Sequence, residues 1–129
     1  MDYGVTLPCT GPLAVAEAID AVATRAEAVG FTSLWVTDHV AIPLRSASRY
    51  PYNADGRYPW DPAIPYLDAF TVLTWAAAST RRVRLGTSVL VLPMRHPLAV
   101  AKTVATLDHL SGGQEIAGSN PVAPAIWKP

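Results

Sequence analysis

Apolar side chains recur along the chain with two different periods, and the alternation of these periods predicts the fold. Short runs of β-branched, aromatic and aliphatic residues predict strands at 3–7, 31–37 and 83–93. Helical patterning, with apolar positions three and four residues apart, predicts helices at 13–30, 67–80 and 98–113. This β-α-β-α-β-α order indicates an α/β fold with a parallel sheet and right-handed crossovers, either open and doubly wound or closed as a barrel.

Glycine and proline mark the ends of the predicted elements. Gly30 follows the first helix and Gly112 follows the third, as left-handed helix stops do. Pro97 stands where the first turn of a helix tolerates it. Residues 31–37 are apolar throughout, which is typical of a strand in a parallel sheet covered by helices.

Residues 39–66 have neither period and form a long predicted loop. The loop contains five prolines, Pro43, Pro51, Pro59, Pro62 and Pro65. It also contains five aromatic residues, Tyr50, Tyr52, Tyr58, Trp60 and Tyr66. These rings either form a lid that faces a ligand or fill the interior of the loop, and the sequence leaves both interpretations open.

Composition narrows the class of protein. Half of the 129 residues are hydrophobic, and ten basic side chains balance ten acidic ones. This balance is typical of a soluble globular chain and gives no basic patch for nucleic acid or for an anionic membrane. No apolar run is long enough to span a membrane, and no signal-peptide pattern follows Met1, so we expect a cytoplasmic protein. The single Cys9 excludes an intramolecular disulfide.

Candidate chemistry lies where the predicted strands end, because ligands of parallel α/β folds bind at the carboxyl ends of the strands. Asp38 and His39 follow the second strand, as either a local capping pair or part of a ligand site. Gly86, Thr87 and Ser88 interrupt the third strand, which indicates a bulge near a ligand or a kink that closes a barrel. The other polar or reactive residues on this predicted rim are Cys9, Thr10 and residues 94–96.

Three other chemistries have weaker support. Residues of metal-ligand type occur at Asp38, His39, His96, Asp108 and His109, but none has the spacing of a known metal motif, so a metal-dependent hydrolase is a less favoured alternative. Cys9 has no activating neighbour in sequence, and we expect it to pack as a small side chain. The segment after the first strand lacks the glycine pattern of a nucleotide-phosphate loop.

Several segments together resemble one family. The segments are "YGVTLP", "AEAVGFTSLWVTDHVAIP" and the stretch from "SRYPYNADGRYPW" to "TLDHLSGG". In this order they resemble the N-terminal part of the luciferase-like monooxygenase family, and most closely its branch of oxidoreductases that use the deazaflavin coenzyme F420. The resemblance covers residues 1–113.

The resemblance implies a fold, a cofactor and site residues. The fold is a TIM (β/α)₈ barrel, here a partial one with three βα units and a long loop after the second strand. The cofactor is coenzyme F420, with FMN as the alternative, and the reaction is hydride transfer with a small organic substrate. Asp38 and His39 match the catalytic pair that lies against the cofactor, with His39 as the proton donor. A cis peptide at Ser88–Val89, flanked by Thr87, would back the cofactor ring, and residues 40–65 would wall the substrate side.

The sequence departs from the family pattern after Gly113. The last segment, "QEIAGSNPVAPAIWKP", is polar and rich in proline, so we predict a disordered tail at 114–129 without a buried strand. Codons for residues 117–122 can also be written to resemble the TΨC arm of a transfer-RNA gene, which gives a hypothesis for the origin of the tail.

Two functional interpretations follow from this departure. A barrel takes roughly 250 residues, so the first is a truncated oxidoreductase that retains Asp38, His39 and the Ser88–Val89 bulge as half of a site. The second is a non-catalytic chain that keeps the fold but binds no cofactor. Open sheet edges in either case predict self-association.

Overall fold

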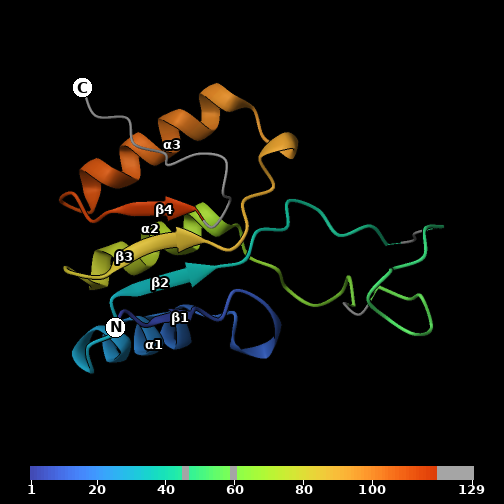
Figure 1. Cartoon of the computed structure of the whole chain (residues 1–129), viewed down its shortest axis with the longest axis horizontal. Coiled ribbons are helices and arrows are strands. Elements are labelled where there is room, and N and C mark those ends of the chain that lie inside the picture. Colours follow the sequence, from blue (N-terminus) through green and yellow to red (C-terminus); the bar gives the residue numbers. More distant parts are fainter. Residues whose placement is uncertain (45–46, 59–60, 119–129) are drawn as a thin grey trace.

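Parallel strands and helices alternate along the part of the chain that the computed structural model describes, residues 1–44, 47–58 and 61–118 (Figure 1). The strands are β1 (Gly4–Thr6), β2 (Ser33–Val36), β3 (Arg84–Thr87) and β4 (Ile116–Gly118). The α-helices are α1 (Ala16–Ala28), α2 (Ala69–Ser79) and α3 (Pro97–Leu110). Two short 3₁₀ helices are η1 (Gly11–Leu13) and η2 (Leu92–Met94). The four strands form one parallel sheet in the order β1-β2-β3-β4.

The two faces of the sheet have different partners, because successive side chains of a strand point to opposite sides. Leu34 and Val36 of β2 are fully buried in the core that the sheet shares with the helices. On the other face, the indole nitrogen of Trp35 donates to the hydroxyl of Ser33 at 2.9 Å. Gly4 of β1 lies against this pair, and a Cβ atom there would come within 2.4 Å of the indole nitrogen. A glycine is therefore required where β1 meets Trp35.

The helices begin and end largely where the sequence predicts. Gly30, Gly112 and Gly113 have positive φ angles just after helices α1 and α3, which confirms them as left-handed stops. Pro97 is the first residue of α3, as predicted. Asp68 caps α2, because its carboxylate accepts a hydrogen bond of 2.9 Å from the Thr71 amide.

Two predictions about strands are wrong. The third strand ends at Thr87 rather than at residue 93, and the apolar residues that follow turn into η2. The segment after Gly113 does contain a strand, since β4 pairs in parallel with β3. Gln114, whose polarity argued against a strand, is buried and donates to the Val83 carbonyl at 2.9 Å. The sheet therefore has four strands instead of three, and residues 119–129 of the predicted tail lie outside the described residues.

The long loop between β2 and α2 extends away from the sheet before it returns (Figure 1). Its described residues contain no helix and no strand, as predicted, although Pro59 and Trp60 lie outside the described residues. Its end is fastened to the segment after β1, where the Leu67 amide donates to the Cys9 carbonyl at 2.8 Å. Within residues 1–44, 47–58 and 61–118, no helix has both the length and the apolar character needed to cross a membrane.

Candidate functional site

The carboxyl ends of the first three strands surround one cleft of about 460 Å³. Its walls are residues 6–10 at the end of β1 and just after it, residues 37–39 after β2, and residues 88, 89 and 91 after β3, together with Tyr50 and Tyr66 of the long loop. One cleft therefore brings together two pairs of predicted site residues, Asp38–His39 and Ser88–Val89, which lie about 50 positions apart in the sequence. Thr87, the fifth predicted site residue, is buried in β3 and does not line the cleft.

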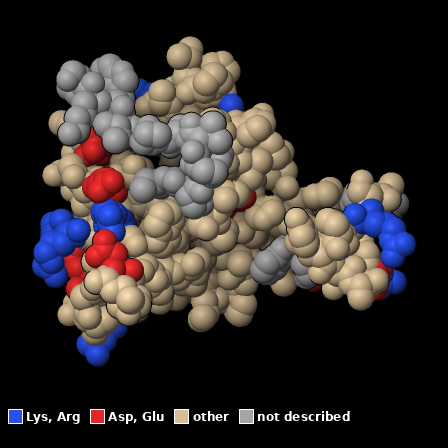
Figure 2. Space-filling view, viewed as in Figure 1, with Lys and Arg blue, Asp and Glu red and all other residues tan. Residues whose placement is uncertain are grey.

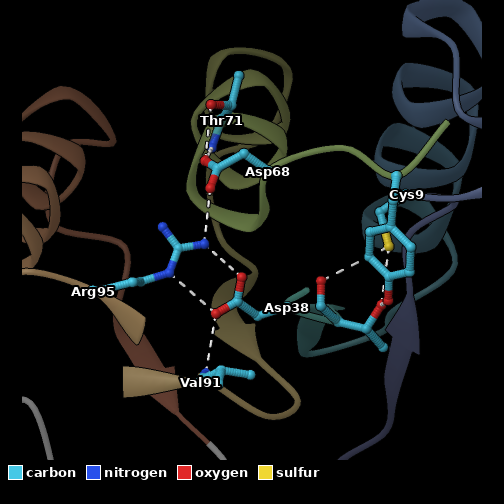
Figure 3. Close-up of polar contacts among 8 residues, drawn as sticks. Cys9, Asp38, Asp68, Thr71, Val91 and Arg95 are labelled. Carbon is cyan, nitrogen blue, oxygen red and sulfur yellow. Dashed lines mark hydrogen bonds and ion pairs between the residues drawn. The ribbon is translucent and has the colours of Figure 1, made fainter. Parts of the chain in front are cut away.

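The carboxylate of Asp38 is buried in an ion pair with Arg95 instead of being exposed in the cleft (Figure 3). Its side chain is 0 % exposed, so the small exposed part of the residue is main chain. Arg95 donates to the two carboxylate oxygens at 2.5 and 3.1 Å, and the Val91 amide donates at 3.0 Å. The acid that the sequence places in catalysis thus presents its backbone to the cleft and its charge to Arg95.

Arg95 also contacts a second acid. Nη2 of Arg95, one of the two nitrogens that donate to Asp38, also donates to Asp68, the capping residue of α2, at 2.8 Å. The guanidinium lies 5.1 Å from the ring centre of Phe70, within the range of a cation–π contact. Hydrogen bonds and charge attraction from Asp38 raise the Arg95 pKa further above its usual range, despite the opposing effect of burial, so the group stays charged. For Asp68, burial acts against the charged form, but hydrogen bonds from Arg95 and Thr71 lower the pKa overall.

A hydrogen-bonded set of three polar side chains, those of Cys9, Thr37 and Tyr66, also lines the cleft. The buried thiol of Cys9 lies 3.1 Å from the Thr37 hydroxyl, which in turn lies 2.5 Å from the Tyr66 hydroxyl (Figure 3). Burial raises the Tyr66 pKa, and the nearby Cys9 adds to this effect, while the hydrogen bond to Thr37 opposes it. Cys9 is 2 % exposed and belongs to the core, which confirms the predicted packing role.

His39 is exposed and lies among tyrosine rings. Its ring centre is 4.9 Å from that of Tyr66, in an edge-to-face arrangement, and 6.3 Å from that of Tyr58. The Tyr58 hydroxyl lies 3.3 Å from Nδ1 of His39. Burial raises the Tyr58 pKa, with a further contribution from Tyr50, whose ring contacts that of Tyr58 at 5.1 Å. Tyr50, Tyr52 and Tyr58 therefore contact one another within the loop, and Tyr50 and Tyr66 also line the cleft. That these rings face a ligand stays a prediction, and Trp60 lies outside the described residues.

The peptide bond between Ser88 and Val89 is cis, as the family resemblance predicts. The Ser88 amide donates to the Val36 carbonyl at 2.8 Å, which fixes the start of this segment at the end of β2. Both residues are exposed to the cleft. Their contact with a cofactor stays a prediction.

Sequence reasoning placed Arg95 on this rim, within residues 94–96, but gave it no role, and it missed Asp68. Arg95 and Asp68 gave no motif, and the only signal for Arg95 was a cation just after an apolar segment at a strand end. Asp68 carried a clearer signal, an acidic residue immediately before a helical pattern. Within the described part of the chain, no three His, Cys, Asp or Glu side chains gather as a metal site.

A second hollow, of about 540 Å³, lies at the opposite ends of the strands. It is lined by charged residues that include Asp2, Arg82 and Arg84, and Figure 2 shows charged side chains gathered at this end of the molecule. Arg84 and Asp2 form an exposed ion pair of 3.0 Å. Although this hollow is larger, ligand chemistry in parallel α/β folds collects at the carboxyl ends of the strands, so we assign the candidate site to the other cleft.

Comparison with known proteins agrees with this geometry. An uncharacterized protein of Mycobacterium tuberculosis is 39% identical over 119 residues, which are 92% of this chain and 41% of that protein. The F420-dependent glucose-6-phosphate dehydrogenase of Kineococcus radiotolerans is 38% identical over 97 residues, 74% of this chain and 24% of the enzyme. This chain thus spans less than half the length of these relatives.

A solved structure supports the same relationship. The coenzyme F420-dependent tetrahydromethanopterin reductase of Methanopyrus kandleri superposes with a TM-score of 0.60 and 28% sequence identity. The superposition covers 90% of this chain and 26% of the reductase, so the four-stranded sheet corresponds to part of a TIM barrel. The model of the luciferase-like monooxygenase family matches residues 2–114 of this chain. The chain belongs to the luciferase-like monooxygenase family.

Proposed function

We propose that this chain forms part of the site of an F420-dependent oxidoreductase, which transfers hydride between the deazaflavin and a small organic substrate. The observation that supports this most directly is the single cleft that His39, Ser88 and Val89 line at the carboxyl ends of the strands. The F420 dependence of the Kineococcus and Methanopyrus proteins favours F420 over FMN, the alternative cofactor.

The cleft suits an organic cofactor. Its volume lies within the range of roughly 300 to 1,000 Å³ that is common for small-molecule sites. Leu7, Val89 and Val91 give it apolar walls, while His39 and Ser88 add polar groups. We propose that residues 88 and 89, the main chain of Asp38 and the His39 ring hold the cofactor, and that Thr87 acts from within β3 as a support.

The cofactor supplies the hydride chemistry when it is bound. The chain's own contribution is to orient the reactants and to hold a proton on His39. We propose that the Tyr58 hydroxyl, which lies 3.3 Å from Nδ1 of His39, donates to this nitrogen. A neutral imidazole then carries its proton on Nε2, as a donor for a group in the cleft.

A titration tests this proposal. The purified chain is mixed with oxidised F420, and separately with FMN, while the fluorescence of each cofactor is followed. We expect saturable binding of F420 and weaker binding of FMN. His39→Gln should weaken F420 binding about threefold to tenfold, the equivalent of one hydrogen bond. His109→Gln is the matched control, because His109 lies in the last turn of α3 and outside the cleft lining. The absence of binding to either cofactor would refute the proposal.

The alternative is a chain that keeps the fold but binds no cofactor. One observation favours it: in the described sheet, the edge strands β1 and β4 each pair on one side only. Unpaired strand edges promote association with other strands. Size-exclusion chromatography with light scattering measures the oligomeric state alongside the titration. An aggregated chain without bound cofactor would support this alternative.

A further inference from the structure

We propose that Arg95 is a positioning residue, which fixes the main chain of Asp38 and of residues 88–91 as one wall of the cleft. This inference rests on the proposed function, because the wall is the one assigned to the cofactor. Arg95 acts through Asp38 and is absent from the residues that line the cleft. Its role is therefore distinct from that of His39 or Ser88.

Asp38 and Arg95 close a loop between the end of β2 and the segment after β3. The segment after β3 leaves the sheet at Ser88, whose amide is held by the Val36 carbonyl. Three residues later the Val91 amide returns to one carboxylate oxygen of Asp38, and Arg95 holds both oxygens. Residues 88–91 are thus tied at both ends to the end of β2, and the cis peptide lies between the two ties.

Arg95 also balances the buried charge of Asp38. A carboxylate with a fully buried side chain, such as that of Asp38, needs a cation with good hydrogen-bond geometry to remain charged. Arg95 provides this geometry with two donor nitrogens, Nε and Nη2, on the two carboxylate oxygens. A lysine keeps the charge but cannot make both contacts in the same plane. The arrangement therefore depends on the shape of the guanidinium as well as on its charge.

Arg95 also connects this wall of the cleft to α2. The second contact of Arg95, with Asp68, places the guanidinium between the β2 end and the first turn of α2. Asp68 is held in turn by the amide and the hydroxyl of Thr71. The wall is thereby anchored to a packed helix as well as to the sheet. Three elements, β2, α2 and the segment between β3 and α3, meet at one side chain (Figure 3).

Amide hydrogen exchange tests this role without any cofactor. We compare Arg95→Met, Arg95→Lys and Asp68→Asn with the unmodified chain. Arg84→Met is the matched control, because it breaks an exposed ion pair at the opposite end of the sheet. Amides of Leu34 and Leu85, both in central strands, report global unfolding, while those of Ser88 and Val91 report local opening of the wall.

A positioning role predicts a local effect beyond any loss of global stability. Exchange at Ser88 and Val91 should accelerate at least tenfold more than at Leu34 and Leu85 in Arg95→Met, and by an intermediate factor in Arg95→Lys. Asp68→Asn should give a smaller local increase of about twofold to threefold, and Arg84→Met none. Equal acceleration at all four amides would show a purely structural ion pair and overturn the inference. If Arg95→Met does not fold, the variants Arg95→Lys and Asp68→Asn provide the test. Equal acceleration of exchange at all four amides in both variants would overturn the inference.

Cofactor binding gives the second measurement. Where the unmodified chain binds F420, we expect Arg95→Met to raise the dissociation constant at least tenfold and Arg95→Lys to restore part of the loss. An unchanged constant, with F420 still bound, would overturn the positioning role and leave the proposed function intact. If the unmodified chain binds neither F420 nor FMN, the proposed function fails, and the exchange data alone decide whether Arg95 fixes the wall.

Discussion

Replacement of Glu27 by alanine should destabilise the fold measurably, because this residue joins α1 to the turn between α2 and β3. One carboxylate oxygen of Glu27 accepts hydrogen bonds from the amides of Arg81, Arg82 and Val83, at 2.8, 2.6 and 3.2 Å. These three amides lie more than 50 positions away in sequence. The contact therefore holds together elements that only the tertiary structure brings near one another.

The expected size of the loss follows from the number and kind of hydrogen bonds. A hydrogen bond to a charged group contributes about 1.5 to 3 kcal/mol, but here one oxygen is shared among three donors. Glu27 is also partly exposed, so water replaces some of the lost contacts in the variant. We expect Glu27→Ala to lower the free energy of unfolding by about 2 kcal/mol, and Glu27→Gln, which keeps a neutral acceptor, by about 1 kcal/mol.

The loss should also depend on pH. Burial alone acts against the charged form of Glu27, but the three amides and the nearby Arg82 lower its pKa below the ordinary value of 4.5. A lowered folded-state pKa stabilises the fold fully above the unfolded-state pKa. This contribution disappears as the pH falls through the folded-state value. The difference in stability between the unmodified chain and Glu27→Gln should therefore be constant near pH 7 and shrink below pH 4.5.

Urea unfolding followed by circular dichroism measures these differences at pH 7 and at several acidic pH values. The midpoint concentrations give the stability changes if the slopes of the transitions agree. A loss below about 0.5 kcal/mol for Glu27→Ala, the range typical of ordinary surface changes, would refute the reasoning. So would a difference between the Gln variant and the unmodified chain that stays constant down to pH 3.

Two further predictions concern the sheet and the lining of the cleft. Gly4→Val should lower the free energy of unfolding by about 1 to 3 kcal/mol, as overpacking does, because the new Cβ would lie 2.4 Å from the indole nitrogen of Trp35. A thermal unfolding midpoint equal to that of the unmodified chain would contradict this close contact. Tyr66→Phe should cost about 0.5 to 1.5 kcal/mol through loss of the hydrogen bond to Thr37. Because burial raises the Tyr66 pKa above 10.0, this difference should be complete below pH 10 and shrink as the pH rises further, and a difference that grows instead would count against the assigned contact.

The fold could be predicted in outline because its signals are local. The apolar period of α1, the glycine stops and Pro97 act within one or two turns of helix, so a short window of sequence contains them. The C-terminal end of β3 was predicted less accurately, at residue 93 instead of Thr87. Residues 88–91 are apolar enough for a strand, yet the Val91 amide bonds to Asp38 instead of to a neighbouring strand. An apolar run by itself does not reveal where its backbone hydrogen bonds go.

The strand β4 shows a related difficulty. Polar Gln114 and the prolines beyond it argued against a strand, but Gln114 finds buried partners at Thr80 and Val83. The amide nitrogen of Gln114 makes both hydrogen bonds, while its Oε1 is buried without a partner among the described residues, and the two acceptors lie more than 30 positions away. Such compensation is invisible in a local pattern.

The sequence by itself determined the alternation of strands and helices, the family, the cleft residues His39, Ser88 and Val89, and the cis peptide that the family resemblance implies. The tertiary structure alone decided what Asp38 does. Its carboxylate pairs with Arg95 instead of being exposed in the cleft, because a buried charge must find a cation, and the cation comes from a segment 57 positions away. Residue type and strand position are local properties, whereas the direction of a charged side chain depends on which distant partner folding brings within reach.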